Sequence, residues 1–135
     1  MDENKSKSAE LSEVKIELAP VPEDLSPNKT PSRWVKASAV KAYRIAAWAR
    51  TLKTIGRKRA PKWETATGHA VFFFAVKRRR DKDNLAASLK AAWDGITDAG
   101  IMANDSGLTP MPVEIVVGPT ERPRVEITIT EGGHA

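Results

Sequence analysis

The sequence of 135 residues contains no cysteine and only two histidines. The lack of cysteine excludes a disulfide framework, a thiolate zinc site and a cysteine nucleophile. The two histidines, His69 and His134, lie far apart in the sequence, which argues against a histidine-centred metal site. No apolar run reaches the length of a membrane span, and the acidic first residues do not resemble a signal peptide. We therefore expect one cytoplasmic domain with no membrane partner.

Acidic residues are scarce in the middle of the chain. The stretch from Lys29 to Lys82 holds 16 of the 22 Lys and Arg residues, against only Glu64 and Asp81, and its net charge is about +14. The flanking segments are acidic on balance. A run of charge is often only a solvated surface, but an imbalance this concentrated favours a polyanionic partner such as a nucleic acid.

The first half of the chain predicts a tail, a strand and a helix. Residues 1–13 are polar, and we expect a disordered tail before a domain that spans 14–131. Residues 14–18 alternate apolar and charged side chains, as a half-buried strand does. A proline-rich stretch then predicts an extended loop. Apolar residues recur at helical spacing over 37–55, and Gly56 is a typical C-terminal stop.

The second half predicts the rest of a small α+β domain. Residues 69–76, HAVFFFAV, are apolar on both faces, which indicates a strand in the middle of a sheet. One long helix is expected to begin at Asp83 or Asn84. Alternating apolar residues predict strands at 113–117 and 125–129. The order β-α-β-α-β-β indicates a single compact α+β domain with a mixed sheet and helices packed on it.

A run of three arginines leads directly into two carboxylates at the end of the predicted central strand. Asp81 and Asp83 are two residues apart, so their side chains point the same way if the chain is extended. Carboxylate oxygens bind divalent ions such as Mg²⁺, and arginines attract phosphate. Asp105 would be the third carboxylate if its loop folds back beside the central strand. The segment predicts a site that brings a phosphodiester to a metal ion.

Each of these carboxylates also has a purely structural interpretation. Asp83 is placed to be the N-cap of the helix, Asp81 to pair with the neighbouring arginines, and Asp105 to form a turn. Asp94 follows Lys90 by four residues, which predicts an ordinary helical ion pair. If these interpretations hold, the chain is a basic DNA-binding module without catalysis.

The motif residues resemble the RusA family of Holliday junction resolvases. That family carries an Arg-rich run followed by Asp-x-Asp-Asn-Leu, and residues 78–85, RRRDKDNL, match it. Residues 90–101, KAAWDGITDAGI, are similar to the family's helix with a lysine, an aromatic residue, an Asp and a closing Ala-Gly. Asn104 and Asp105 stand where the family usually has Asp-Asp. The resemblance covers about 14–131, and the lysine follows the motif three residues later than is usual.

The resemblance implies a homodimeric, Mg²⁺-dependent endonuclease that nicks four-way DNA junctions symmetrically in recombination and repair. Mn²⁺ would substitute for Mg²⁺, and no small-molecule cofactor is expected. Asp81, Asp83 and Asp105 would be catalytic metal ligands, with Lys90 as the catalytic basic residue and Lys82 as the other candidate. The residues expected to bind DNA phosphates are Lys77, Arg78, Arg79, Arg80, Arg57, Lys58 and Arg59. A metal nuclease acting on other branched DNA is the nearest alternative.

Two groups of aromatic side chains have competing interpretations. Phe72 to Phe74 and Trp93 either pack in the core or lie at a dimer interface. Trp34, Trp48 and Trp63 are expected to stack on exposed bases of a junction, although helix packing explains Trp48 equally well.

Overall fold

The computed structural model describes residues 11–27, Thr30 and 32–132. Most of the predicted tail and His134 lie outside the described residues. The first strand begins at Glu13, one residue inside that predicted tail, so the folded domain starts slightly earlier than expected.

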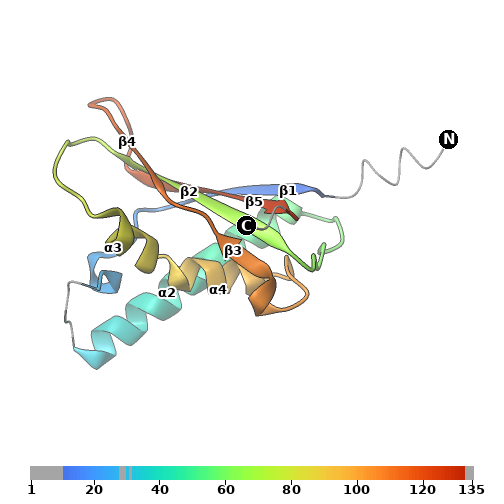
Figure 1. Ribbon diagram of the computed structural model, residues 1–135. Coiled ribbons are helices and arrows are strands. Elements are labelled where there is room, and N and C mark those ends of the chain that lie inside the picture. The colour runs from blue at the N-terminus through green and yellow to red at the C-terminus, as the bar shows by residue number, and fades with distance from the viewer. Residues whose placement is uncertain (1–10, 28–29, 31, 133–135) are drawn as a thin grey trace.

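A five-stranded mixed sheet forms one layer of the domain, and helices cover one of its faces (Figure 1). The strands are β1 (Glu13–Leu18), β2 (Ala66–Phe74), β3 (Leu108–Pro110), β4 (Glu114–Val117) and β5 (Arg124–Glu131). Strand β2 is central, because it pairs antiparallel with β5 and parallel with β3 and β4, while β1 pairs antiparallel with β5. This arrangement confirms the predicted α+β class and mixed sheet. The three-residue β3 was not predicted, since it is too short to show alternation.

Strand β2 overlaps the predicted 69–76, but it begins three residues earlier, at Ala66, and ends two residues earlier, at Phe74; only one of its faces is fully buried. Its side chains alternate between buried and half-buried positions along the strand. Gly68 on the buried face admits the ring of Trp93, since a Cβ at Gly68 would lie 2.6 Å from a ring carbon of that tryptophan. Both faces of β2 are apolar because the strand is central in the sheet, although helices cover only one of these faces.

The first long helix, α2 (Arg33–Ile55), begins four residues before the predicted start. Its start is set by Ser32, whose side chain accepts a hydrogen bond from the Val35 N–H at 3.2 Å. The helix ends at Gly56, which has a φ of 64°, as the C-terminal glycine predicted. Its buried residues follow at four-residue intervals and face the core; they are Tyr43, Ala47, Thr51 and Ile55.

The predicted helix after the Asp motif is two helices, α3 (Lys82–Ala87) and α4 (Lys90–Asp98). The break lies at Ser88, whose hydroxyl donates to the Leu85 carbonyl at 2.7 Å and so competes with regular helical bonding. Leu89 follows the break and is fully buried. The change of direction therefore lets α3 lie at the edge of the domain while α4 packs on its core.

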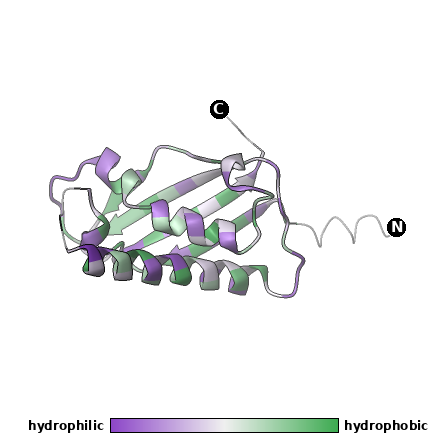
Figure 2. Cartoon of the chain, turned by 90° about the horizontal axis from the view of Figure 1, so that it is seen from below, coloured by the Kyte–Doolittle hydropathy of each residue, from purple (hydrophilic) through white to green (hydrophobic). Residues whose placement is uncertain are grey.

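Helices α2 and α4 lie side by side in close contact beneath the sheet, as the view from below shows (Figure 2). Gly95 makes this approach possible, because a Cβ there would overlap the carbonyl oxygen of Arg44 and lie 2.9 Å from the Ala47 Cβ. Within the described part of the chain, none of the helices is both long and apolar enough to cross a membrane.

Candidate nucleic-acid and metal site

A basic loop leaves the end of β2 and leads into α3. Lys77, Arg78 and Arg79 in this loop are exposed, and Arg80 is half-buried. The loop runs directly into Asp81, so the structure keeps the arginines and the Asp motif at one end of the central strand. We call residues 77–80 the basic loop.

The second predicted basic cluster lies elsewhere. Arg57, Lys58 and Arg59 are exposed and directly follow Gly56, in the connection from α2 to the start of β2. The basic loop follows the other end of β2. One DNA segment would therefore have to extend along the domain, or a second chain would have to take part, for both clusters to bind it.

Asp81, and not Asp83, is the N-cap of α3. Its Oδ1 accepts hydrogen bonds from the backbone N–H groups of Asp83 at 2.8 Å and Asn84 at 3.4 Å. The prediction that the helix starts at Asp83 or Asn84 was wrong, because the chain is already helical at Lys82. Asp83 is exposed in the first turn, where the helix dipole favours a negative charge.

Asp105 lies at the opposite end of the central strand. It begins a short 3₁₀ helix, Asp105–Gly107, which leads into β3. Strand β3 does fold back beside β2, but its register pairs Leu108 with Ala66, the first residue of β2. A nine-residue strand spans about 26 Å. One chain therefore does not bring Asp105 together with Asp81 and Asp83.

The predicted three-carboxylate metal site is thus not assembled within a single chain. Among the residues that the structure describes, no group of three or more His, Cys, Asp or Glu side chains is placed to hold a metal ion. Two of the predicted ligands, Asp81 and Asp83, are exposed and adjacent, and their hard oxygens suit Mg²⁺. Since Asp81 also caps α3, the pair forms only part of such a site.

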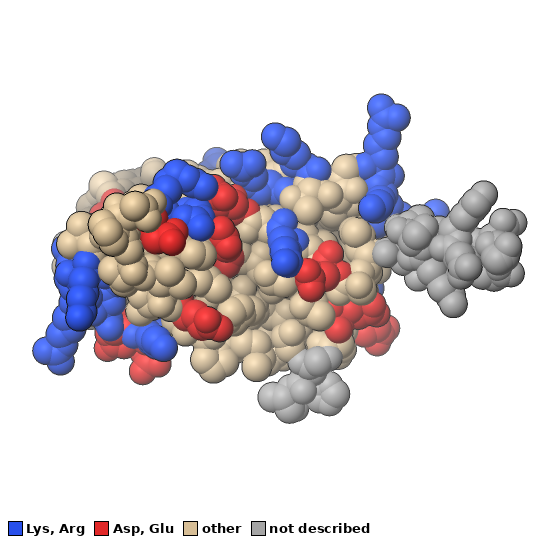
Figure 3. Space-filling view, turned by 90° about the horizontal axis from the view of Figure 1, so that it is seen from above, with Lys and Arg blue, Asp and Glu red and all other residues tan. Residues whose placement is uncertain are grey.

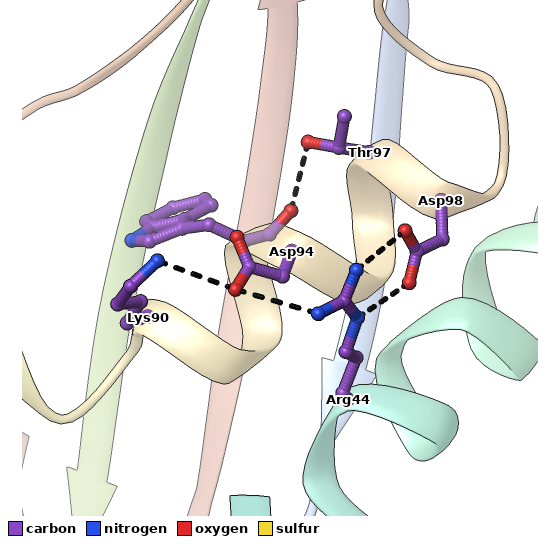
Figure 4. Close-up of polar contacts among 6 residues, drawn as sticks. Arg44, Lys90, Asp94, Thr97 and Asp98 are labelled. Atoms are coloured by element: carbon purple, nitrogen blue, oxygen red, sulfur yellow. Dashed lines mark hydrogen bonds and ion pairs between the residues drawn. The ribbon is translucent and has the colours of Figure 1, made fainter. Parts of the chain in front are cut away.

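Lys90 belongs to a polar network that joins α4 to α2 (Figure 4). Its Nζ lies 3.4 Å from Asp94 Oδ2, which confirms the predicted helical ion pair. Arg44 of α2 reaches the same Asp94 oxygen at 3.8 Å and holds Asp98 with two hydrogen bonds of 2.6 and 2.9 Å. The bond to Asp98 raises the pKa of Arg44, and the bond to Arg44 lowers the pKa of Asp98. The network has a structural role, because it joins α4 to α2.

The aromatic residues divide into core and surface. Phe72 is 2% exposed, and Trp93 packs against the core, as the core interpretation predicted. Trp63 is 5% exposed and pairs its backbone with Met102, so the prediction that it stacks on bases was wrong. Trp34 at 78% exposure is open to such a contact.

Two arginine–aromatic contacts were not predicted. The guanidinium carbon of Arg80 lies 3.5 Å from the centre of the Phe74 ring, and that of Arg124 lies 3.7 Å from the centre of the Phe73 ring. Arg124 faces Phe73 across the β2–β5 pair. The sequence carries no signal for this second contact, because it depends on strand register. The first joins residues six apart and could have been suspected from a loop returning on its own strand.

Positive charge is not gathered on the open face of the sheet. Seen from above, that face carries a mixture of basic and acidic side chains (Figure 3). Helix α2 on the other side has six basic residues and no acidic one; they are Arg33, Lys36, Lys41, Arg44, Arg50 and Lys53. The surfaces best suited to a polyanion are therefore α2 and the two basic clusters at the ends of β2.

A scan of the chain against protein-family models and a search of the curated proteins both gave no match. The likeness to the RusA family therefore stays a resemblance of motif residues.

Proposed function

We propose that this chain is a Mg²⁺-dependent endonuclease that cleaves four-way DNA junctions, as the RusA family that it resembles does. The observation that carries the proposal is the placement of the basic loop and the exposed pair Asp81 and Asp83 at one end of the central strand. A phosphate held by the arginines would lie beside hard oxygen ligands. Phosphodiester hydrolysis needs these two groups close together.

The residues of the site would have separate roles. The side chains of the basic loop would fix the DNA by its phosphates without reading its sequence. A bound Mg²⁺ would supply charge neutralisation at the phosphate and an activated water. Lys82 lies between the two carboxylates in the first turn of α3 and fits the basic role more directly than Lys90, whose amino group bonds to Asp94.

The third carboxylate would come from a second copy of the chain. The pair Asp81 and Asp83 lies at one end of β2, and Asp105 lies at the other. Within one chain, the pair and the third carboxylate are therefore too far apart to hold the same ion. In a dimer with twofold symmetry, the Asp pair of each copy could be completed by Asp105 of the partner subunit. Two such sites would also be able to nick two opposed strands.

The first test compares a mobile four-way junction with a linear duplex of the same sequence, each in Mg²⁺ and in EDTA. We expect paired symmetric nicks in the junction alone and only with Mg²⁺. Asp83→Asn should abolish these nicks and leave junction binding within about tenfold, roughly 1.4 kcal/mol. Asp83 is the better choice than Asp81, whose side chain also caps α3. Asp94→Asn is the matched control and should cut normally.

Subunit mixing tests the shared site. Asp83→Asn and Asp105→Asn proteins should each be inactive alone. If the site is shared, a mixed dimer retains one intact site, with the wild-type Asp83 of one copy and the wild-type Asp105 of the other. Mixing should therefore restore nicking of one strand. No recovery in proven mixed dimers would show that each site is built from one chain.

A non-catalytic DNA-binding module is the second candidate. It is favoured by the use of Asp81 as a helix cap and by the separation of Asp105 from the pair. Equal junction binding in Mg²⁺ and EDTA with no cut product would establish it. Cleavage of flaps or plain duplex in place of junctions would instead indicate a metal nuclease of other specificity.

A further inference from the structure

A cavity of about 750 Å³ opens beside the basic loop. Its walls come from residues 20–26, the last residues of β2, the start of β5 and the helix α3. The charged residues in these walls are four arginines and one carboxylate; they are Arg78, Arg79, Arg80, Arg124 and Glu23. The volume lies in the range of ligand pockets in proteins. The excess of arginines suits an anion.

Arg80 is the arginine of this cavity that the loop holds most firmly in place. It is half-buried, and its Nη1 donates to the carbonyl oxygens of Val76 at 3.1 Å and Arg78 at 3.4 Å. Within the described part of the chain, no Asp or Glu forms an ion pair with Arg80, whereas Arg124 pairs with Glu126. Because these hydrogen bonds are exposed to solvent, the guanidinium of Arg80 can also bind an anion such as a phosphate.

Arg80 also brings a planar group to the cavity, because its guanidinium lies flat on an aromatic pair. The rings of Phe72 and Phe74 are stacked, with centres 6.2 Å apart and planes inclined by 14°. The guanidinium of Arg80 lies on Phe74 at 3.5 Å. A guanidinium on an aromatic ring has a second face, on which a nucleic-acid base can stack.

We propose that this cavity holds one unpaired nucleotide of the DNA, its base stacked on the guanidinium of Arg80 and its phosphate held by Arg78 and Arg79. The inference rests on the proposed function and names the part of the substrate that the site takes. Such a pocket would select DNA whose strands are unstacked, because a base within a regular duplex is not free to enter it. It would thus add recognition of distorted DNA to a loop that otherwise binds phosphates without reading sequence.

The test measures DNA binding by fluorescence anisotropy in EDTA, so that no cleavage is needed. The probes are a labelled duplex with one unpaired adenosine, the same duplex with an abasic residue at that position, and the fully paired duplex. We expect the adenosine bulge to bind at least about fivefold more tightly than the abasic bulge, since stacking on one base is worth that much. The abasic and paired duplexes should bind alike.

Arg80→Lys keeps the charge but removes the planar group, and should abolish this preference, which is measured as the ratio of the affinities for the adenosine and abasic bulges of the same protein. Arg79→Lys is the matched control and should keep the preference, because the role of Arg79 needs only its charge. Thermal unfolding of both variants confirms that they are folded. Equal binding of the adenosine and abasic bulges, or a preference retained by Arg80→Lys, overturns the inference.

Three further outcomes bear on this inference and on the proposed function. Inorganic phosphate that displaces the adenosine bulge and the paired duplex at the same concentration would show that the cavity binds anions only. A protein that cuts junctions with Mg²⁺ but shows no base preference would retain the proposed function and lose the nucleotide pocket. A protein that binds none of the probes or junctions would lose both.

Discussion

Replacing Gly95 with alanine tests the close packing of α4 on α2. Two effects of opposite sign compete. Alanine is the better helix former, which favours the variant by about 1 kcal/mol. Against this, the new methyl group would overlap the Arg44 carbonyl oxygen and lie 2.9 Å from the Ala47 Cβ and 3.0 Å from the Trp48 backbone nitrogen.

The steric effect should win. Extra atoms in a well-packed interior usually cost about 1–3 kcal/mol, and the upper end applies here because a backbone atom cannot rotate away. We therefore expect the free energy of unfolding, measured by urea denaturation, to fall by about 2 kcal/mol. Gly118→Ala is the control, since its Cβ would meet only the flexible Glu121 side chain at 3.4 Å. A Gly95→Ala protein as stable as the wild type, or more stable, would refute the close packing.

Two further predictions concern carboxylates. Asp81→Ala should lower the free energy of unfolding by about 1 kcal/mol, because it removes the cap of α3, whereas Asp83→Ala should be nearly neutral. Both variants are measured by urea denaturation. Equal effects of the two would contradict the assignment of Asp81 as the cap. Asp98→Asn should destabilise the protein slightly at pH 7, because the ion pair with Arg44 lowers the pKa of Asp98 and exposed pairs contribute little. That contribution exists above the ordinary carboxyl pKa and disappears as the pH falls through the lowered one, so wild type and variant should converge in strong acid. If the free energies of unfolding of wild type and Asp98→Asn still differ in strong acid, the variant has lost packing and not only the ion pair.

The arrangement of the candidate site has a consequence for assembly. Its basic loop and Asp pair follow one end of β2, while Asp105 and the cluster Arg57 to Arg59 lie near the other end. A cleavage site that needs all these groups is complete only if two chains meet in opposite directions. A strictly monomeric protein would therefore have to act through Asp81 and Asp83 alone, or bind DNA without cutting it.

Much of the fold could be read from local patterns. Alternation in residues 14–18 predicted β1, and helical spacing with Gly56 at the end predicted α2. These predictions hold because the burial of one face imposes a period on the sequence that any helix or strand must follow. The Lys90–Asp94 pair could be predicted for the same reason, since helical geometry alone sets its spacing.

The breaks and ends of the helices were harder to predict from the sequence. The sequence predicted one helix where Ser88 divides α3 from α4, because a hydroxyl that competes for a backbone carbonyl leaves no mark on the apolar spacing. The choice of Asp81 over Asp83 as the cap followed from where the first helical turn forms. Both depend on local hydrogen bonds that several residues could have made.

The sequence by itself determined the chemistry that the chain can offer: a basic central stretch, an Arg-rich run ending in two carboxylates, and a later Asp. Only the tertiary structure decided which of these groups meet. The register of β3 on β2 placed Asp105 at the far end of the central strand, and the loop after β2 returned Arg80 onto Phe74. Register and loop path are set by packing between residues distant in the chain, and no local pattern of side chains encodes them.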